Sequence, residues 1–170
     1  MTKVKVQFNH PKYSDDALCS SISEILNGNI LSAMATVKDS GGWISTAYYC
    51  FNSSLDFYIL TEPTTQHSLN LAKNKSVALG IYDSHQEWDL DKKGLQIFGE
   101  CERVEGMKLI EATRLYLERF SGLSKWIKHA DDFAKGIINS RFYVIRTKSL
   151  KLFDEVTFGK ENYITLDIVK

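Results

Sequence analysis

The chain has 170 residues, of which 21 are basic and 21 acidic, so its formal net charge is zero. This balance gives no reason to expect nucleic-acid binding, and a content of 44% hydrophobic residues excludes a low-complexity chain. No stretch approaches the ~20 apolar residues that a membrane helix needs, and the first residues carry no apolar segment of secretory length. We therefore expect a single cytoplasmic domain over residues 1–170 that binds neither nucleic acid nor a membrane.

The cysteines and histidines give no sign of a metal site. The cysteines are odd in number and far apart, which predicts neither a disulfide framework nor a zinc site. Three of the histidines, His10, His85 and His129, have no second ligand at metal-binding spacing. No base is visible near Cys50, so we expect no cysteine nucleophile.

The first predicted element is a helix that begins after Ser14 and ends at Gly28. Ser14 is a favourable N-cap, and the carboxylates of Asp15 and Asp16 suit the positive end of a helix. Four apolar residues at helical spacing share one face: Leu18, Ile22, Ile25 and Leu26. Such a helix is typical of one that packs across a sheet or a barrel.

From residue 30 the pattern changes to the period of two that is typical of strands. It predicts strands over 31–37, 43–51 and 55–61, joined by turns at 38–42 and 52–54. Three consecutive strands with tight turns form an antiparallel meander.

The rest of the chain adds strands and helices in alternation. A short helix begins at Thr64 or Thr65 and runs to Asn74, and Gly99 marks a bulge or a close approach of two backbones. Further strands are predicted over 77–81, 95–101, 141–152 and, at an edge, within 158–169, with helices over 106–120 and 124–134. The whole pattern predicts a small, mainly antiparallel β-barrel decorated with helices.

Polar groups gather where the strand 55–61 meets the short helix. They belong to Thr61, Thr64, Thr65, Gln66 and His67. A strand end that leads into a helix N-terminus offers backbone N–H groups to an anion, so a phosphate-bearing small ligand is expected here. Local alternatives stay open, because His67 could be a surface residue and the Thr61 hydroxyl could satisfy nearby backbone. Lys73 is better explained as a cation at the negative end of the helix.

The order of these segments resembles the pyridoxamine phosphate oxidase-like split-barrel superfamily, over about residues 14–155. The segments that carry it are Leu31–Val37, Gly41–Ser45, Phe57–Thr61, Leu69–Asn74, Val77–Leu79 and Leu95–Glu100. A closer likeness is to a small bacterial branch, the YhbP-like proteins. It rests on Tyr48–Phe51, Phe57–Glu62 with His67, Gly94–Glu100, Arg119-Phe120 and Phe158–Lys160.

The resemblance implies a six-stranded antiparallel split β-barrel of Greek-key type with flanking helices. It also implies a homodimer that binds FMN at the subunit interface. The implied cofactor-binding residues are Ser45, Thr46, Ala47, Thr61, Glu62, Thr65, Gln66, His67 and Gln96. Flavin-binding members hold the phosphate with a basic triplet, whereas Thr65, Gln66 and His67 stand at those positions here. An amide cannot replace the charged fork of arginine, so a weaker grip on the phosphate is expected.

The resemblance leaves three functions open. The first is an FMN-dependent oxidoreductase of unknown substrate, in which the cofactor carries the chemistry and no catalytic residue is evident. The second is a non-catalytic protein that binds a flavin, haem or another phosphorylated ligand on the same dimeric barrel. The third is a dimeric scaffold without a cofactor.

Two further observations concern the homodimer. The strands carry more large side chains than a small barrel is expected to bury, namely Trp43, Tyr48, Tyr49, Phe51 and Phe57. Adjacent strand residues point to opposite faces, so Tyr48 and Tyr49 should not both be buried. Trp88 lies in a polar loop and could cover a ring or, as we prefer, pack at the dimer interface.

Overall fold

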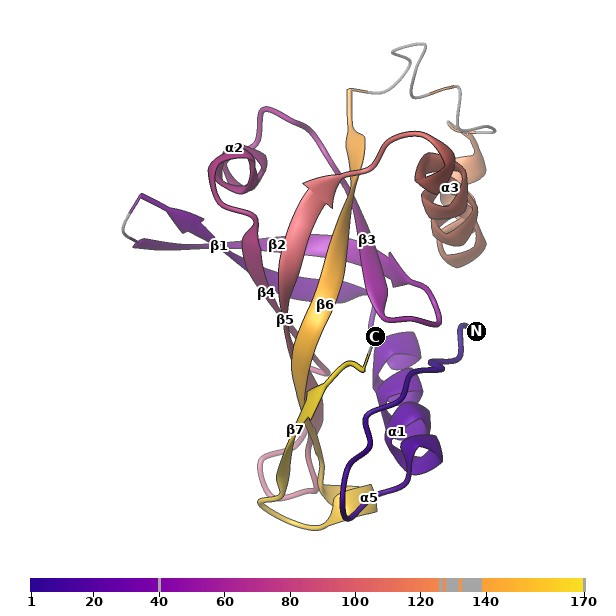
Figure 1. Cartoon of the computed structure of the whole chain (residues 1–170), viewed down its shortest axis with the longest axis vertical. Coiled ribbons are helices and arrows are strands. Elements are labelled where there is room, and N and C mark those ends of the chain that lie inside the picture. Colours follow the sequence, from indigo (N-terminus) through magenta and orange to yellow (C-terminus); the bar gives the residue numbers. More distant parts are fainter. Residues whose placement is uncertain (40, 126, 128–131, 133–138, 170) are drawn as a thin grey trace.

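The computed structural model describes residues 1–39, 41–125, 127, 132 and 139–169. Its strands are β1 (Leu31–Lys38), β2 (Gly41–Phe51), β3 (Asp56–Thr61), β4 (Ser76–Tyr82), β5 (Lys93–Arg103), β6 (Arg141–Asp154) and β7 (Tyr163–Asp167). They form one antiparallel sheet in the order β3-β2-β1-β4-β5-β6-β7. Because β3 also pairs with β6, the strands β1 to β6 close into a barrel (Figure 1). The predicted mainly β, six-stranded antiparallel barrel is confirmed.

Helices flank the barrel, and all but α5 were predicted from the sequence. They are α1 (Asp15–Gly28), α2 (Gln66–Lys73), α3 (Met107–Arg119) and α5 (Glu155–Phe158), with a 3₁₀ turn at Ser121–Lys125. The Ser14 hydroxyl accepts a hydrogen bond from the backbone N–H of Ala17 at 3.3 Å, which confirms the predicted N-cap of α1. The predicted helix over 124–134 lies largely outside the described residues.

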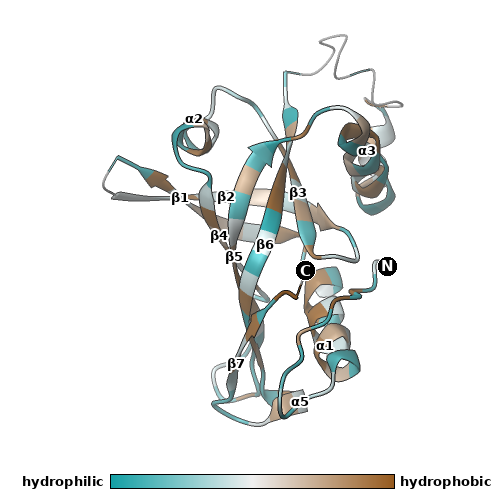
Figure 2. Cartoon of the chain, viewed as in Figure 1, coloured by the Kyte–Doolittle hydropathy of each residue, from teal (hydrophilic) through white to brown (hydrophobic). Residues whose placement is uncertain are grey.

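The barrel interior is filled from alternating positions of each strand. One inward row crosses four strands and consists of Met34, Leu79, Ile97 and Leu150, all buried. The apolar face of α1 and Leu71 of α2 join the same core. Figure 2 shows apolar and polar segments interleaved along α1 and α3, the pattern of helices that bury one face.

A second, smaller core lies between α3 and the outer side of β3 and β6. It contains Tyr58, Ala112, Leu115, Tyr116, Phe142 and Val144. The Tyr58 hydroxyl donates to Glu111 Oε2 at 3.0 Å and so ties β3 to α3. α3 therefore covers one part of the outer barrel surface, while the outer side of β1 and β4 has no such cover among the described residues.

The large aromatic residues of β2 and β3 correct one argument from the sequence. Tyr49, Phe51 and Phe57 are fully buried within a single chain, because α1 covers them. They therefore do not require a second subunit. Tyr48 is 52% exposed while Tyr49 is buried, which confirms that the two point to opposite faces.

Among the glycines of the described strands, Gly99 alone lies where the neighbouring backbone leaves no room for a Cβ. The β5–β6 register shifts between Phe98 and Gly99. A Cβ on Gly99 would lie 2.3 Å from the backbone oxygen of Arg146, well inside contact distance. The predicted bulge or close approach is confirmed.

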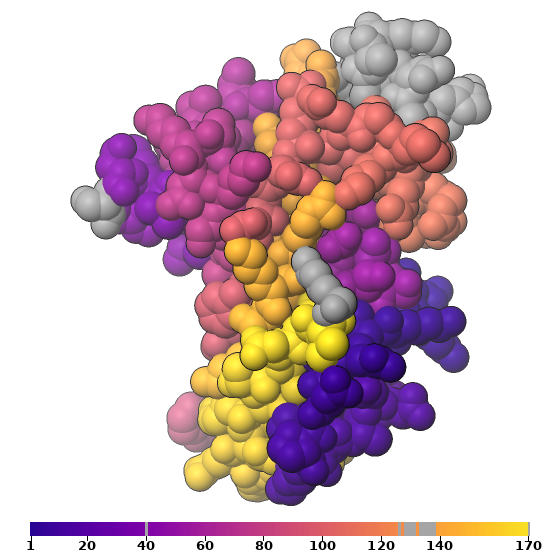
Figure 3. Space-filling view, in the orientation of Figure 1, coloured from indigo at the N-terminus to yellow at the C-terminus, as the bar shows by residue number. Residues whose placement is uncertain are grey.

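The two ends of the described chain lie side by side. The backbone N–H of Val169 donates to the oxygen of Gln7 at 3.2 Å, and the N-terminal segment (indigo) adjoins the C-terminal one (yellow) in Figure 3. Among the described residues no helix is long and apolar enough to span a bilayer.

Candidate functional site

A cluster of hydroxyl groups surrounds one imidazole where β3 meets α2. The Nε2 atom of His67 lies 2.7 Å from Thr61 Oγ1 and 3.0 Å from Thr65 Oγ1. The Thr65 hydroxyl is also 2.9 Å from Ser68 Oγ, which donates to the backbone oxygen of Glu62. We call Thr61, Thr65, His67 and Ser68 the hydroxyl–histidine cluster.

Burial lowers the pKa of His67 below its ordinary value of 6.5. The imidazole is therefore neutral at neutral pH, and its Nε2 accepts from a threonine hydroxyl when the proton lies on Nδ1. In this state His67 contributes a polar ring to the site and no positive charge.

The N-terminus of α2 remains open to an anion. Thr65 occupies the N-cap position, yet its side chain makes no capping hydrogen bond, and the first turn contains no acidic residue. The partial positive charge of the helix end is thus not offset by a neighbouring side chain of α2. Gln66 lies in this turn, and its amide donates to Asn70 Oδ1 at 2.8 Å.

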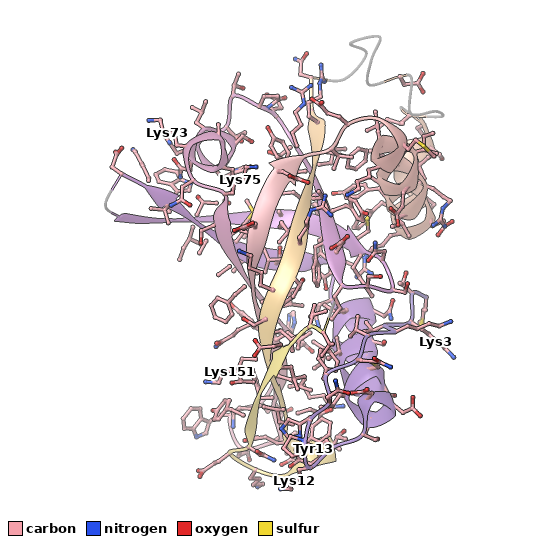
Figure 4. All side chains as sticks on the ribbon, viewed as in Figure 1. Lys3, Lys12, Tyr13, Lys73, Lys75 and Lys151 are labelled. Atoms are coloured by element: carbon pink, nitrogen blue, oxygen red, sulfur yellow. The ribbon has the colours of Figure 1, made fainter. Side chains whose placement is uncertain are left out.

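A hollow of about 620 Å³ adjoins the flank of α2. Gln66, Lys38, Asp39 and Lys73 are among its lining residues, so two cations and one carboxylate border it. Lys73 projects from the end of α2 (Figure 4). Sequence reasoning did not identify Lys38, because it lies in a hairpin far from α2 along the chain.

The outer side of β2, β1, β4 and β5 forms a flat surface of small residues. Strand pairing places Thr46, Ala33, Gly80 and Gln96 in one row, and Ile44, Ala35, Ala78 and Phe98 in the next. We call the four central residues, Ala33, Ala35, Ala78 and Gly80, the platform. A Cβ on Gly80 would meet Tyr82 and Ala33 only at 3.7 and 4.0 Å, so packing within the chain does not require glycine there.

The platform and the start of α2 belong to one continuous surface. A second hollow, of about 410 Å³, is lined by Ala35, Ala78 and Phe98. Val37 lines both this hollow and the one beside Gln66. The hollow beside the platform and the hollow beside α2 therefore adjoin at Val37.

The structure brings together some of the cofactor-binding residues that the resemblance implies, in two groups, and places the others elsewhere. Thr61, Thr65, Gln66 and His67 come together at the start of α2, and Thr46 and Gln96 lie in one row across the platform. Ser45 and Ala47 pair with the inward-facing Met34 and Ser32, so their side chains lie on the other face of β2. The side chain of Glu62 is exposed.

The platform residues themselves were not identified from the sequence. The alternation of Leu31, Ala33, Ala35 and Val37 is the signal that could have revealed them. The structure buries the intervening Ser32, Met34 and Thr36 instead, so the small residues face outward. Trp88 is 90% exposed in the single chain.

Comparison with known proteins supports the fold. No protein-family model matches the chain. The chain is 33% identical over 79 residues to the UPF0306 protein YhbP of Escherichia coli strain SMS-3-5, a match that covers 46% of this chain. The match spans 53% of that relative, about half its length.

Solved structures extend the likeness to nearly the whole chain. A haem-binding protein from Mycobacterium smegmatis superposes with a TM-score of 0.69 at 16% identity, over 91% of this chain and 59% of that one. A general stress protein 26-related protein of the pyridoxinephosphate oxidase family, from Clostridium acetobutylicum, gives 0.64 at 14% identity, over 91% and 96%. An FAD-binding protein from Mesorhizobium loti gives 0.56 at 15% identity, over 75% and 88%.

The chain thus has the barrel fold of these solved structures, which include one of the pyridoxinephosphate oxidase family. Within that class its partial sequence similarity is to the YhbP proteins, as the sequence motifs predict.

The lowered pKa of His67 makes a prediction about stability. Since unfolding restores an ordinary pKa, the unfolded chain binds a proton at His67 more readily than the folded chain does. The contribution of His67 is fully present above pH ~6.5 and is lost as the pH falls toward the folded-state pKa. The free energy of unfolding of the wild type, minus that of His67→Gln, should therefore decrease from about pH 7 to about pH 5. Urea unfolding of both proteins measures it, and a pH-independent difference contradicts the buried neutral imidazole.

Proposed function

We propose that the chain binds FMN with its ring on the platform and its phosphate toward the N-terminus of α2. The observation that carries this proposal is the row Thr46–Ala33–Gly80–Gln96, in which two residues without bulk separate two polar side chains. Neighbouring strands lie ~4.8 Å apart, so the row extends roughly 14 Å, which is long enough for a fused ring system. Small side chains let a flat ring lie close to the backbone of the sheet.

The phosphate end is supported by the open turn of α2. The Thr65 side chain does not cap this turn, so the first backbone N–H groups of α2 could bind a phosphate. Lys38 and Lys73 border the adjoining hollow and add positive charge. Because lysine does not form a planar fork, we expect a weaker grip than an arginine would give.

The names of the structural neighbours support a cofactor with a flat conjugated ring. Proteins of this fold include one named haem-binding, one named FAD-binding and one assigned to the pyridoxinephosphate oxidase family. The uncapped N-terminus of α2 suits the phosphate of a flavin, which is the ligand that we propose for this chain.

When bound, FMN supplies hydride transfer, so we propose an FMN-dependent oxidoreductase whose substrate the site does not identify. The residues of the chain bind and orient the ring. The amide of Gln96 and the hydroxyl of Thr46 stand at opposite ends of the row, where they can hydrogen-bond polar ring atoms.

We further propose that the chain forms a homodimer through the platform face. Large apolar side chains surround the platform there and are exposed in the single chain: Leu31, Ile44, Tyr48, Tyr82 and Phe98. Contiguous exposed apolar surface of this kind is typical of an interaction site. A two-fold dimer would place the same face of both copies together and would cover a ring bound there.

The platform can be tested with Gly80→Val. The added side chain has room within the chain but would stand where the ring is proposed to lie. We expect FMN quenching titrations to show binding by the wild type and a loss of at least about tenfold in the variant, since a displaced ring forfeits its contact with the sheet. Thr165→Val, which places the same side chain on the exposed face of β7, should bind like the wild type.

Two results would contradict this placement. One is equal FMN affinity in Gly80→Val and the wild type. The other is saturable haem binding, seen as a Soret shift, with no FMN binding, which would favour the alternative ligand. The unfolding transition of each variant shows whether the fold is intact.

The phosphate end can be tested with Gln66→Arg. A guanidinium at the first turn of α2 should tighten FMN by roughly 1–3 kcal/mol, because a charge-assisted hydrogen bond replaces a neutral one. Riboflavin, which lacks the phosphate, should show no comparable gain in the same titration. An equal gain for both ligands, or none for FMN, would place the phosphate elsewhere.

The homodimer can be tested with Ile44→Glu. Ile44 is 75% exposed at the edge of the platform, and a buried unpaired carboxylate opposes association. Light scattering should give about twice 19.4 kDa for the wild type and 19.4 kDa for the variant. Val156→Glu, at an exposed position in α5, is the control and should remain dimeric. A monomeric wild type at micromolar concentration would refute the dimer.

A further inference from the structure

Arg119, the last residue of α3, reaches across to the end of α1. Its Nη2 donates to the backbone oxygens of Leu26 and Asn29, at 2.6 and 2.5 Å. The guanidinium carbon lies 4.9 Å from the ring centre of Tyr49 and 5.5 Å from that of Phe51. The last turn of α1 contains no basic residue, so Arg119 supplies the cation that the negative end of α1 favours.

These interactions leave part of the guanidinium unsatisfied. The Nε atom of Arg119 is buried and has no hydrogen-bond partner among the described residues. No carboxylate of the described ranges lies within ion-pair distance of Arg119, since the adjacent Glu118 pairs with Arg114 at 2.6 Å. A buried N–H without a partner is costly, and a buried cation without a counter-ion attracts an anion.

A cavity of about 320 Å³ adjoins this guanidinium. It lies between the end of α1, the end of β2 and α3, and no platform residue lines it. Its lining combines Arg119 and the amide-bearing Asn27 with the apolar side chains of Ile30, Phe51 and Leu115. The carboxylate of Glu118 also lines it, and its charge is offset by the ion pair with Arg114. The thiol of Cys50 also lines it, and burial raises the pKa of this thiol to about 12, so it stays uncharged. The volume is at the lower end of the range for small-molecule sites.

We propose that this cavity binds a small organic carboxylate. The carboxylate would lie against Arg119, whose planar guanidinium matches that group, and the apolar body would pack on Ile30, Phe51 and Leu115. A guanidinium with apolar side chains beside it fits an amphipathic monoacid better than a phosphate, which has no apolar part to bury. The site is separate from the platform and does not depend on flavin binding.

The test uses benzoate as the probe and benzamide as its uncharged equivalent, with ligand-free protein. Benzoate should give saturable shifts in ¹H–¹⁵N spectra, including the side-chain Nε–H signal of Arg119, and benzamide should not. Arg119→Lys should weaken benzoate by at least about tenfold, the loss expected for one charge-assisted hydrogen bond. Arg103→Lys, the same change at an exposed arginine, should leave the affinity unchanged.

A second variant guards against a folding defect in Arg119→Lys. Ile30 is half-exposed at the cavity, so Ile30→Trp should fill the space with little effect on the unfolding transition, and it should abolish benzoate binding. The proposal is overturned if benzoate and benzamide bind alike, if benzoate gives no saturable shift at millimolar concentration, or if Ile30→Trp binds as the wild type does.

Discussion

Pairing between β3 and β6 is the constraint on which the rest of the structure depends. Every residue of β3, from Asp56 to Thr61, pairs with a residue of β6, from Arg146 to Arg141. About half of the chain lies between these strands, so bringing them together costs conformational entropy. Burial of the core that the closed barrel encloses must offset this cost. Closure gives the sheet an inside and an outside, and it fixes which side chains reach each.

Closure also decides where a ligand can bind. α3 follows β5 and returns over the outer side of β3 and β6, where Tyr58, Tyr116 and Phe142 form the smaller core. The outer side of β1 and β4 is left uncovered by the described helices, and the residues at its centre are alanine and glycine. α3 thus covers one part of the outer surface and leaves another part open, and the open part contains the platform.

Local features of the sequence were sufficient to predict the elements. Capping at Ser14, the change of period at residue 30 and the isolated Gly99 each act within a few residues, and each prediction is confirmed. The cluster of Thr61, Thr65 and His67 was found for the same reason, since its members lie within seven residues of one another. The effects of tertiary cover were not predictable: Phe51 and Phe57 are buried within the chain by α1, although their number had suggested a second subunit.

The platform depends on register, which a single sequence does not reveal. Three strand pairings must each have the correct register to form the row. They pair Thr46 with Ala33, Ala33 with Gly80, and Gly80 with Gln96. A slip of one residue in any of them would send the side chains to the other face. The resemblance suggested Thr46 and Gln96, but it did not show that small residues join them or that Ser45 and Ala47 face the other way.

The arrangement of charges suggests how a ligand on this surface would be held. His67 is neutral, and the cations beside α2 are lysines on flexible stems, so electrostatic attraction to a phosphate is modest. The exposed apolar side chains around the platform offer a larger contribution to binding than these charges do. If a second copy covers them, the ring and the interface are buried together, and each stabilises the other by the same free energy. Ligand affinity would then rise with protein concentration, because association completes the wall of the site that a single chain leaves open.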